Sequence, residues 1–235
     1  MPKDNEKLPE WENVLSQAAH LQRLLPDAVL VGGTATAAHV QHRFSRDADH
    51  ILTDLRLRFD DVLAHLESVA GWKTARIKRP VLILGSLNGI ETGIRQLIRD
   101  EPLEVVKLNF GNIVISVPTM AEILRIKGVL ILKRNATRDY LDFAALASAM
   151  QDQELRDALS RFDELYPQAS GESPSQQLQA QLSNPLPDDL EEVNLAEYKN
   201  LNPHWQQWGN VCAACERVAL DIFEHIANPS ASPRP

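Results

Sequence analysis

The sequence predicts an α/β (α+β) fold, with a mixed sheet flanked by helices and a helical module at the C-terminus. In residues 11–71, apolar segments as long as strands alternate with amphipathic segments at helical spacing. In residues 72–117 the spacing of apolar residues approaches two, which is typical of strands. From residue 118 onward the spacing is again that of helices. Strands and helices should therefore be mixed in the first part, with helices alone in the last.

The first part should open with one helix and continue as strand, helix, strand and helix. Apolar residues between Trp11 and Leu25 recur at helical spacing, and Pro26 ends that helix. Residues 28–31 are apolar throughout, which is typical of a buried strand. The expected elements are helices over residues 11–25, 34–41 and 60–69 and strands over residues 28–31 and 47–53.

The middle of the chain is predicted to consist of strands joined by short turns. Arg79 and Pro80 separate the first two strands, and Arg99–Pro102 is expected to turn a hairpin. The expected strands cover residues 72–77, 81–84, 94–98, 103–110 and 113–117, and helices follow over residues 118–133 and 135–150.

The last part of the chain is acidic and helical in pattern, and loops rich in proline and serine separate its helices. These helices are expected over residues 155–165, 176–182 and 205–226. We expect a catalytic domain over residues 1–150, a helical C-terminal module over residues 151–228 and a disordered tail over residues 229–235.

The composition predicts a cytoplasmic protein without a membrane partner. Hydrophobic residues make up 44% of the chain, and no apolar run approaches the length of a membrane span. The N-terminus is polar and lacks the apolar region of a signal peptide. Cys212 and Cys215 form a lone Cys-x-x-Cys pair, too few ligands for a zinc site, and are expected to pack inward on their helix.

The net charge of −8 argues against a protein that coats nucleic acid by bulk attraction. The charge is uneven, however, because residues 73–138 hold twelve basic and five acidic residues. A basic region beside an acidic metal site would suit a polyanionic substrate. Solvated faces of strands and helices explain the same residues equally well, so both interpretations stay open.

The stretch that carries the chemistry joins a turn, Gly32–Thr34, to a predicted strand that contains Asp47 and Asp49. Side chains two residues apart on a strand share a face, so these two carboxylates should lie side by side although they repel each other. A divalent cation between them, Mg²⁺ or Mn²⁺, best explains such a pair. The glycines let the backbone approach a triphosphate, and the start of a helix favours anions. Together these features indicate nucleotidyl transfer.

In order and spacing, these residues resemble the signature of the DNA polymerase β-type nucleotidyltransferase superfamily. The more detailed resemblance is to the AbiEii/AbiGii family of type IV toxin-like nucleotidyltransferases. The residues that match its pattern Gly-Gly-Thr…His-Arg-x-Ser-x-Asp-x-Asp are Gly32, Gly33, Thr34, His42, Arg43, Ser45, Asp47 and Asp49. The resemblance implies a polymerase β-type nucleotidyltransferase domain in which these glycines and Thr34 bind phosphates, and Arg43 and Ser45 bind the nucleotide or orient the aspartates.

A second signature of that family is matched by Lys127, Arg134, Arg138, Asp139 and Asp142. The resemblance implies that Lys127 neutralises charge on the triphosphate, and that Asp139 or Asp142 positions this lysine or the nucleophile. The simpler interpretation is a solvated helix lysine and two carboxylates that compensate the charge of a helix N-terminus.

Members of the superfamily often carry a third carboxylate on a later strand. Glu104 is the best-placed candidate for this metal ligand, but the expected aspartate pattern is absent there, which leaves the general base unassigned. A transition-metal site built from His39, His42 and His50 is a minor alternative.

The function implied by the resemblance is Mg²⁺-dependent transfer of NMP from an NTP to RNA, in particular to tRNA 3′ ends. It also implies a toxin-like component of a type IV toxin–antitoxin system, with a separately encoded antitoxin as partner. The alternatives are nucleotidylation of a protein and a catalytically inert nucleotide-binding regulatory protein. The intact Asp47 and Asp49 argue against the inert protein.

Overall fold

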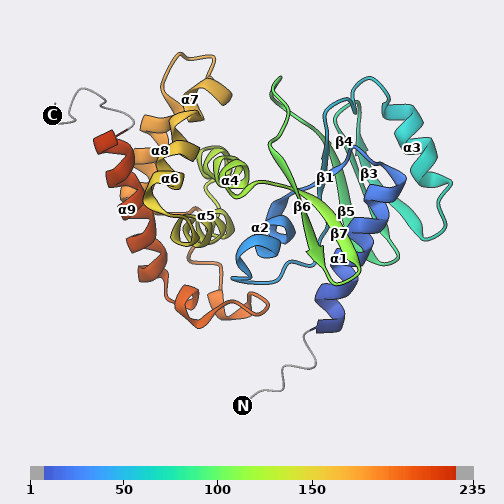
Figure 1. Ribbon diagram of the computed structural model, residues 1–235, viewed down its shortest axis with the longest axis horizontal. Coiled ribbons are helices and arrows are strands. Elements are labelled where there is room, and N and C mark those ends of the chain that lie inside the picture. The colour runs from blue at the N-terminus through green and yellow to red at the C-terminus, as the bar shows by residue number, and fades with distance from the viewer. Residues whose placement is uncertain (1–7, 226–235) are drawn as a thin grey trace. The chain divides into compact units, whose positions relative to one another are not determined.

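The computed structural model describes residues 8–225, and the chain divides into two compact units (Figure 1). Unit 1 contains the residues up to Ala38 together with Phe44–Thr119. Unit 2 contains His39–Arg43 together with the residues from Met120 onward. The boundary between the units first crosses the chain within helix α2 (Gly32–Val40).

Unit 1 is built on a five-stranded sheet with the strand order β1-β2-β5-β4-β3. Strands β2 and β5 run parallel, and the other neighbouring strands run antiparallel. The mixed sheet expected from the sequence is therefore confirmed. The strands are β1 (Val29–Leu30), β2 (His50–Leu52), β3 (Trp72–Lys78), β4 (Leu82–Leu87) and β5 (Ile90–Gln96).

The core of unit 1 lies between one face of this sheet and two helices, α1 (Leu8–Leu24) and α3 (Phe59–Glu67). Each helix turns its apolar stripe toward the sheet, as its helical spacing predicts. Burying such side chains contributes about 1.5–3 kcal/mol each and holds the helices on the sheet. The main contributors are Leu21, Phe59, Val62, Leu66, Leu52, Trp72, Ile83, Leu87 and Ile94.

A second, two-stranded sheet in unit 1 consists of β6 (Val105–Phe110) and β7 (Ile113–Pro118). One side chain of α1 satisfies both backbone groups of Ser116 in β7. The Gln22 amide donates to the Ser116 carbonyl at 2.8 Å and accepts from the Ser116 N–H at 2.8 Å. The Gln22 side chain thereby satisfies backbone groups of β7 that would otherwise be unpaired at the edge of this sheet.

The hairpin that the sequence placed around Arg99–Pro102 is wrong. Strands β4 and β5 form the hairpin instead, and its turn is Asn88-Gly89, with positive φ values of 50° and 85°. Two residues with positive φ make a type I′ turn, whose twist matches that of the flanking strands, and Asn-Gly is its preferred pair. Strand β5 therefore begins at Ile90 rather than at the expected residue 94.

Unit 2 is a set of packed helices. Helix α4 can approach its neighbours closely because of Gly128, where a Cβ would lie 3.0 Å from Leu178 and 3.2 Å from Phe162. The helices are α4 (Met120–Arg134), α5 (Thr137–Ala149), α6 (Asp152–Ser160), α7 (Phe162–Leu165), α8 (Pro174–Ser183) and α9 (Trp208–His225), with short 3-10 helices η2 (Leu195–Glu197) and η3 (Pro203–Gln206).

Helices α4 and α5 belong to unit 2, together with the later helices. The division expected at residue 150, between a catalytic domain and a helical C-terminal module, stays a prediction. The tail expected over residues 229–235 lies outside the described residues.

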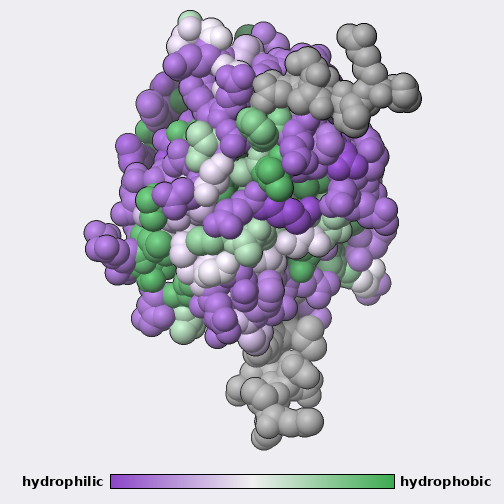
Figure 2. Space-filling model, turned by 90° about the vertical axis from the view of Figure 1, so that its left-hand side faces the viewer, coloured by the Kyte–Doolittle hydropathy of each residue, from purple (hydrophilic) through white to green (hydrophobic). Residues whose placement is uncertain are grey.

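Within residues 8–225, no helix combines the length and the apolarity needed to cross a membrane. On α9, Cys215 packs inward as expected, whereas Cys212 is partly exposed. Burial raises the pKa of both thiols, so both stay protonated near neutral pH. The side of the molecule in Figure 2 carries hydrophobic side chains in small groups set among hydrophilic ones. This side is therefore mixed in character rather than covered by one apolar patch.

Candidate active site

The predicted strand over residues 47–53 is shorter in the structure, because β2 begins at His50 and the segment with Asp47 and Asp49 leads into it. Backbone hydrogen bonds to the neighbouring strands continue through this segment. The N–H of Ala48 donates to the Glu91 carbonyl at 2.8 Å, and the Asp49 carbonyl accepts from the Val31 N–H at 2.8 Å. Ala48 is buried between two partly exposed carboxylates. In an extended segment, residues i and i+2 point to the same side, so both aspartates face away from the core.

The glycine turn lies against this segment in unit 1. Gly32 has a positive φ of 75°, and a Cβ on it would lie 3.9 Å from the Asp49 Cβ. The Thr34 hydroxyl donates to the Asp47 carbonyl at 2.5 Å, which ties the first turn of α2 to the aspartates. The first N–H groups of a helix have no partner within it and favour anions. The amides that follow Gly32 are therefore suited to phosphate beside Asp47 and Asp49.

Two side chains adjust the charge and orientation of the carboxylates. The Ser45 hydroxyl donates a short hydrogen bond to Asp47 Oδ1, which fixes that carboxylate. An Arg95 Nη2 lies 3.9 Å from Asp49 Oδ2, and the two side chains are 47% and 28% exposed. This half-exposed ion pair stabilises the fold little, but it partly neutralises the carboxylate pair.

Gly93 on β5 is a site residue that the sequence interpretation missed. A Cβ on Gly93 would lie 2.2 Å from Asp49 Oδ1 and 3.0 Å from Leu84. The Asp49 carboxylate therefore lies flat on the strand, in a space that only glycine leaves open.

The second set of predicted residues lies in unit 2, around Asp142 of α5. This carboxylate is fully buried and accepts from the His42 Nε2 at 2.7 Å. The Arg43 guanidinium donates to both carboxylate oxygens, at 2.8 and 3.0 Å. The Lys127 ammonium lies 2.6 Å from Asp142 Oδ2 and 3.3 Å from Asp139 Oδ1.

Asp139 is also fully buried, and it extends this cluster toward the surface. It accepts two hydrogen bonds from Arg134, whose side chain is 38% exposed. We call His42, Arg43, Lys127, Arg134, Asp139 and Asp142 the buried charge cluster. The lysine is only 2% exposed, so the simpler interpretation, a solvated helix lysine, does not describe it.

The electrostatics of the buried charge cluster fix the charge states of two members. Burial would raise the pKa of Asp142, but the Arg43 and Lys127 charges and the hydrogen bond from His42 hold it well below its usual range. Burial lowers the pKa of His42, against the opposing effect of Asp142. The imidazole is therefore neutral, and its proton is on Nε2, because the ionised carboxylate can only accept.

No family model matches the chain. Two solved structures from Helicobacter pylori are similar to it along nearly its whole length. A candidate nucleotidyltransferase is 15% identical with a TM-score of 0.56, covering 99% of this chain and all of that one. The protein JHP933 is 16% identical with a TM-score of 0.54, covering 97% of this chain and 96% of that one. The chain has the nucleotidyltransferase fold.

Curated proteins with similar sequences carry other names. The chain is 31% identical to the "Probable transport protein MmpL11" of Mycobacterium bovis and to the "Heme uptake protein MmpL11" of Mycobacterium tuberculosis. The similarity covers 90% of this chain but 22% of each relative. The chain thus spans about a fifth of the length of the curated relatives it matches.

Asp47 and Asp49 are the residues of this nucleotidyltransferase fold that suit a metal ion. Within residues 8–225, no three or more His, Cys, Asp or Glu side chains are grouped to hold a metal. Glu104, which accepts from the Thr119 hydroxyl at 3.3 Å, therefore does not complete a three-carboxylate site. Mg²⁺ commonly takes one or two carboxylates, together with waters and substrate phosphates. Two partly exposed aspartates beside the glycine turn that opens α2 fit that ion.

The alternative metal site built from His39, His42 and His50 is wrong, because the part of the chain between residues 8 and 225 holds no such group of ligands. His50 is fully buried, and burial lowers its pKa to about 4. Its Nδ1 lies 2.9 Å from the Ala48 carbonyl, so the neutral ring donates to the segment between the two aspartates. In this nucleotidyltransferase fold, His50 supports the carboxylates from the core side.

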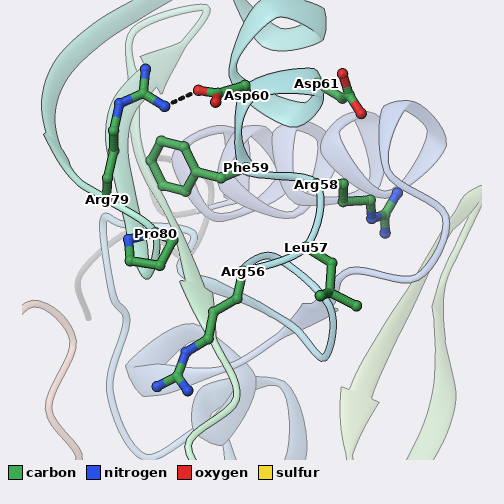
Figure 3. A pocket seen from close by; sticks show the side chains of 8 residues that line it. All are labelled: Arg56, Leu57, Arg58, Phe59, Asp60, Asp61, Arg79 and Pro80. Atoms are coloured by element: carbon green, nitrogen blue, oxygen red, sulfur yellow. Dashed lines mark ion pairs between the residues drawn. The ribbon is translucent and has the colours of Figure 1, made fainter.

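A pocket of about 220 Å³ in unit 1 is lined by none of the predicted site residues (Figure 3). Its most prominent contact is an ion pair between Arg79 and Asp60, and the Arg79 guanidinium lies 5.0 Å from the centre of the Phe59 ring. These two opposite charges are already paired with each other. The lining residues are Arg56, Leu57, Arg58, Phe59, Asp60, Asp61, Arg79 and Pro80.

Proposed function

We propose that the chain is a Mg²⁺-dependent nucleotidyltransferase that transfers NMP from an NTP to an acceptor hydroxyl on RNA. The observation that carries the proposal is the arrangement in unit 1, where Asp47 and Asp49 lie beside the glycine turn that opens α2. The fold shared with a candidate nucleotidyltransferase supports the same reaction class.

In this reaction the acceptor oxygen forms a bond to the α-phosphorus, and the bond between this phosphorus and the oxygen bridging to the β-phosphate breaks, releasing pyrophosphate. Asp47 and Asp49 hold the metal, and Ser45 keeps the first of these carboxylates in place. Mg²⁺ or Mn²⁺, when bound, neutralises charge on the triphosphate and the attacking oxygen. The backbone amides of Gly32, Gly33 and Thr34 bind the β- and γ-phosphates.

The residues of the buried charge cluster have a supporting part in the proposal. In unit 2 the Lys127 ammonium is 2% exposed and is held by Asp139 and Asp142, so it is not open to direct contact with a triphosphate. The part that the family resemblance implies for this lysine stays a proposal. Arg43 and His42 fix Asp142 in turn. Burial makes each of these charges act more strongly than it would in water.

The acceptor and the biological role are proposed from the resemblance to the AbiEii/AbiGii family. We propose RNA, with tRNA 3′ ends as the preferred acceptor, and a toxin-like component of a type IV toxin–antitoxin system whose partner is a separately encoded antitoxin. The exposed basic residues of unit 1, which include Lys73, Arg76 and Lys78, favour a polyanionic acceptor.

Transfer should depend on the carboxylate pair. In a reaction with labelled NTPs, Mg²⁺ and total RNA, we expect label on RNA with the unaltered chain and a loss of at least about 100-fold for Asp47→Asn or Asp49→Asn. Asp61→Asn, which changes an exposed carboxylate of α3, is the matched control and should transfer normally. Label on RNA that persists in both site variants would contradict the proposal.

The curated relatives are named for transport or heme uptake and not for nucleotidyl transfer. The second candidate is therefore a catalytically inert nucleotide-binding regulatory protein. The same reaction separates the candidates. Label on protein indicates nucleotidylation of a protein. Binding of Mg²⁺ and NTP without any labelled product indicates the regulatory protein.

A further inference from the structure

The sheet face that carries Asp49 continues across unit 1 to a basic edge strand. In the register of the sheet, Ile51 of β2 pairs with Arg95 of β5, Arg95 with Leu82 of β4, and Leu82 with Lys78 of β3. Cross-strand partners share a face, and Asp49 lies two residues before Ile51. One row of side chains therefore runs from the candidate metal site to the edge strand β3.

A second row follows the same direction. Gly93 pairs with Leu84, and Leu84 pairs with Arg76. The Asp49 carboxylate lies on Gly93, so this row also begins at the candidate metal site. From β2 to β3 the face spans three strand spacings, or about 14 Å.

A β-bulge decides which basic residues of β3 reach this face. The register shifts between Thr74 and Arg76. Lys73 pairs with Ser86 and Arg76 with Leu84, two residues apart on β4, although the two basic residues are three apart on β3. Without the extra residue, Arg76 and Lys78 would point to the core face when Lys73 points away from it. The bulge thus brings three positive charges to the side of Asp49.

These three basic side chains are available to a ligand. Lys73, Arg76 and Lys78 are all exposed, and no carboxylate among residues 8–225 lies within ion-pairing distance of them. The half-buried Leu82 and Leu84 lie between them and the candidate metal site. Besides Asp49, the acidic Glu91 also lies on this face, through its pairing with Ser86.

We propose that this face, defined by Lys73, Arg76, Lys78 and Arg95 and called the basic sheet face, binds the single-stranded 3′ end of the acceptor RNA and directs its terminal hydroxyl toward Asp49. The inference rests on the proposed function and names the surface that the acceptor uses. Positive charges at the edge complement the phosphates, and the exposed parts of Leu82 and Leu84 offer apolar contact to unstacked bases. A duplex would keep its bases stacked away from these leucines, which favours a single strand.

The test is the salt dependence of RNA binding. Fluorescence anisotropy with a single-stranded RNA oligonucleotide that ends in a 3′ hydroxyl is measured for Asp47→Asn, so that no transfer occurs, and for the same chain with Lys73→Gln, Arg76→Gln and Lys78→Gln. The slope is that of the logarithm of the RNA binding constant against the logarithm of the salt concentration. Loss of three phosphate contacts is expected to reduce its magnitude by about 2. The control carries Arg23→Gln, Lys107→Gln and Lys133→Gln, an equal charge change at exposed residues outside this face, and should keep the slope.

Equal slopes for the two triple variants, or no RNA binding by the parent chain, would overturn the proposal that the basic sheet face binds RNA. Transfer to RNA by the unaltered chain with no difference between the triple variants would refute this surface but not the proposed function. If the slope difference is found as expected but the unaltered chain transfers no nucleotide, the RNA-binding surface is supported and the proposed function is refuted.

Discussion

Gly93→Ala is expected to lower nucleotidyl transfer by about 100-fold or more while the chain stays folded. The added Cβ would lie 2.2 Å from Asp49 Oδ1, so the carboxylate must rotate away from the position it shares with Asp47. The side chain of an aspartate can move, and alanine suits a strand at least as well as glycine does. Unfolding free energy should therefore change by no more than about 1 kcal/mol. Initial rates of transfer and urea unfolding measure the two effects.

The matched control for this substitution is Gly209→Ala on α9, where a Cβ would meet nothing within 4 Å. It should change neither the rate nor the stability appreciably. Normal transfer by Gly93→Ala would show that the position of the Asp49 carboxylate does not matter to the reaction. Unfolding of Gly93→Ala would instead show that β5 cannot accept the methyl group. The part of the Asp49 carboxylate would then be tested by the transfer rate of Asp49→Asn.

Asp142→Ala is expected to lower the unfolding free energy by about 3–5 kcal/mol, a large part of what holds a domain of this size together. The buried carboxylate is shared by His42, Arg43 and Lys127, and its removal leaves two buried positive charges with fewer partners. Desolvation of an unpaired charge costs more than the lost attraction alone. Urea unfolding followed by circular dichroism measures the difference.

An exposed ion pair of the same unit provides the control. Glu164→Ala removes the partner of Arg161 at the surface, 3.3 Å apart and with side chains 41% and 61% exposed. It should cost no more than about 1 kcal/mol. A similar small loss for Asp142→Ala would contradict the structural importance of the buried charge cluster. Loss of transfer in Asp142→Ala, at a temperature where it remains folded, would in turn support a part for this carboxylate in the reaction.

Local sequence spacing was sufficient to predict the centre of the candidate site. Gly32, Gly33 and Thr34 lie within twenty residues of Asp47 and Asp49, and the strand–helix–strand pattern between them brings the turn against the carboxylates. Gly93 could not be found that way, because its contact with Asp49 arises from the parallel pairing of β2 and β5. A glycine inside a strand was the available signal, since such a residue often marks close approach by another group.

Two other features depended on long-range packing. The bulge between Thr74 and Arg76 reverses the faces of the residues that follow it, and nothing in the local pattern of β3 predicts it. Asp142 meets His42 across 100 residues, so its burial could not be seen from helical spacing. The hairpin at Asn88-Gly89 is different, because that dipeptide is a strong local turn signal that the sequence interpretation did not use.

The central claim is that Asp47 and Asp49 hold a divalent cation beside the turn that begins at Gly32. Amide NMR spectra of the isotopically labelled chain, recorded during titration with Mn²⁺ and a non-hydrolysable NTP analogue, test it directly. We expect selective broadening of the amide signals of Gly33, Thr34, Ala48 and Gly93, and none of this broadening in Asp47→Asn. Broadening centred on other residues, or unchanged spectra at saturating nucleotide, would contradict it.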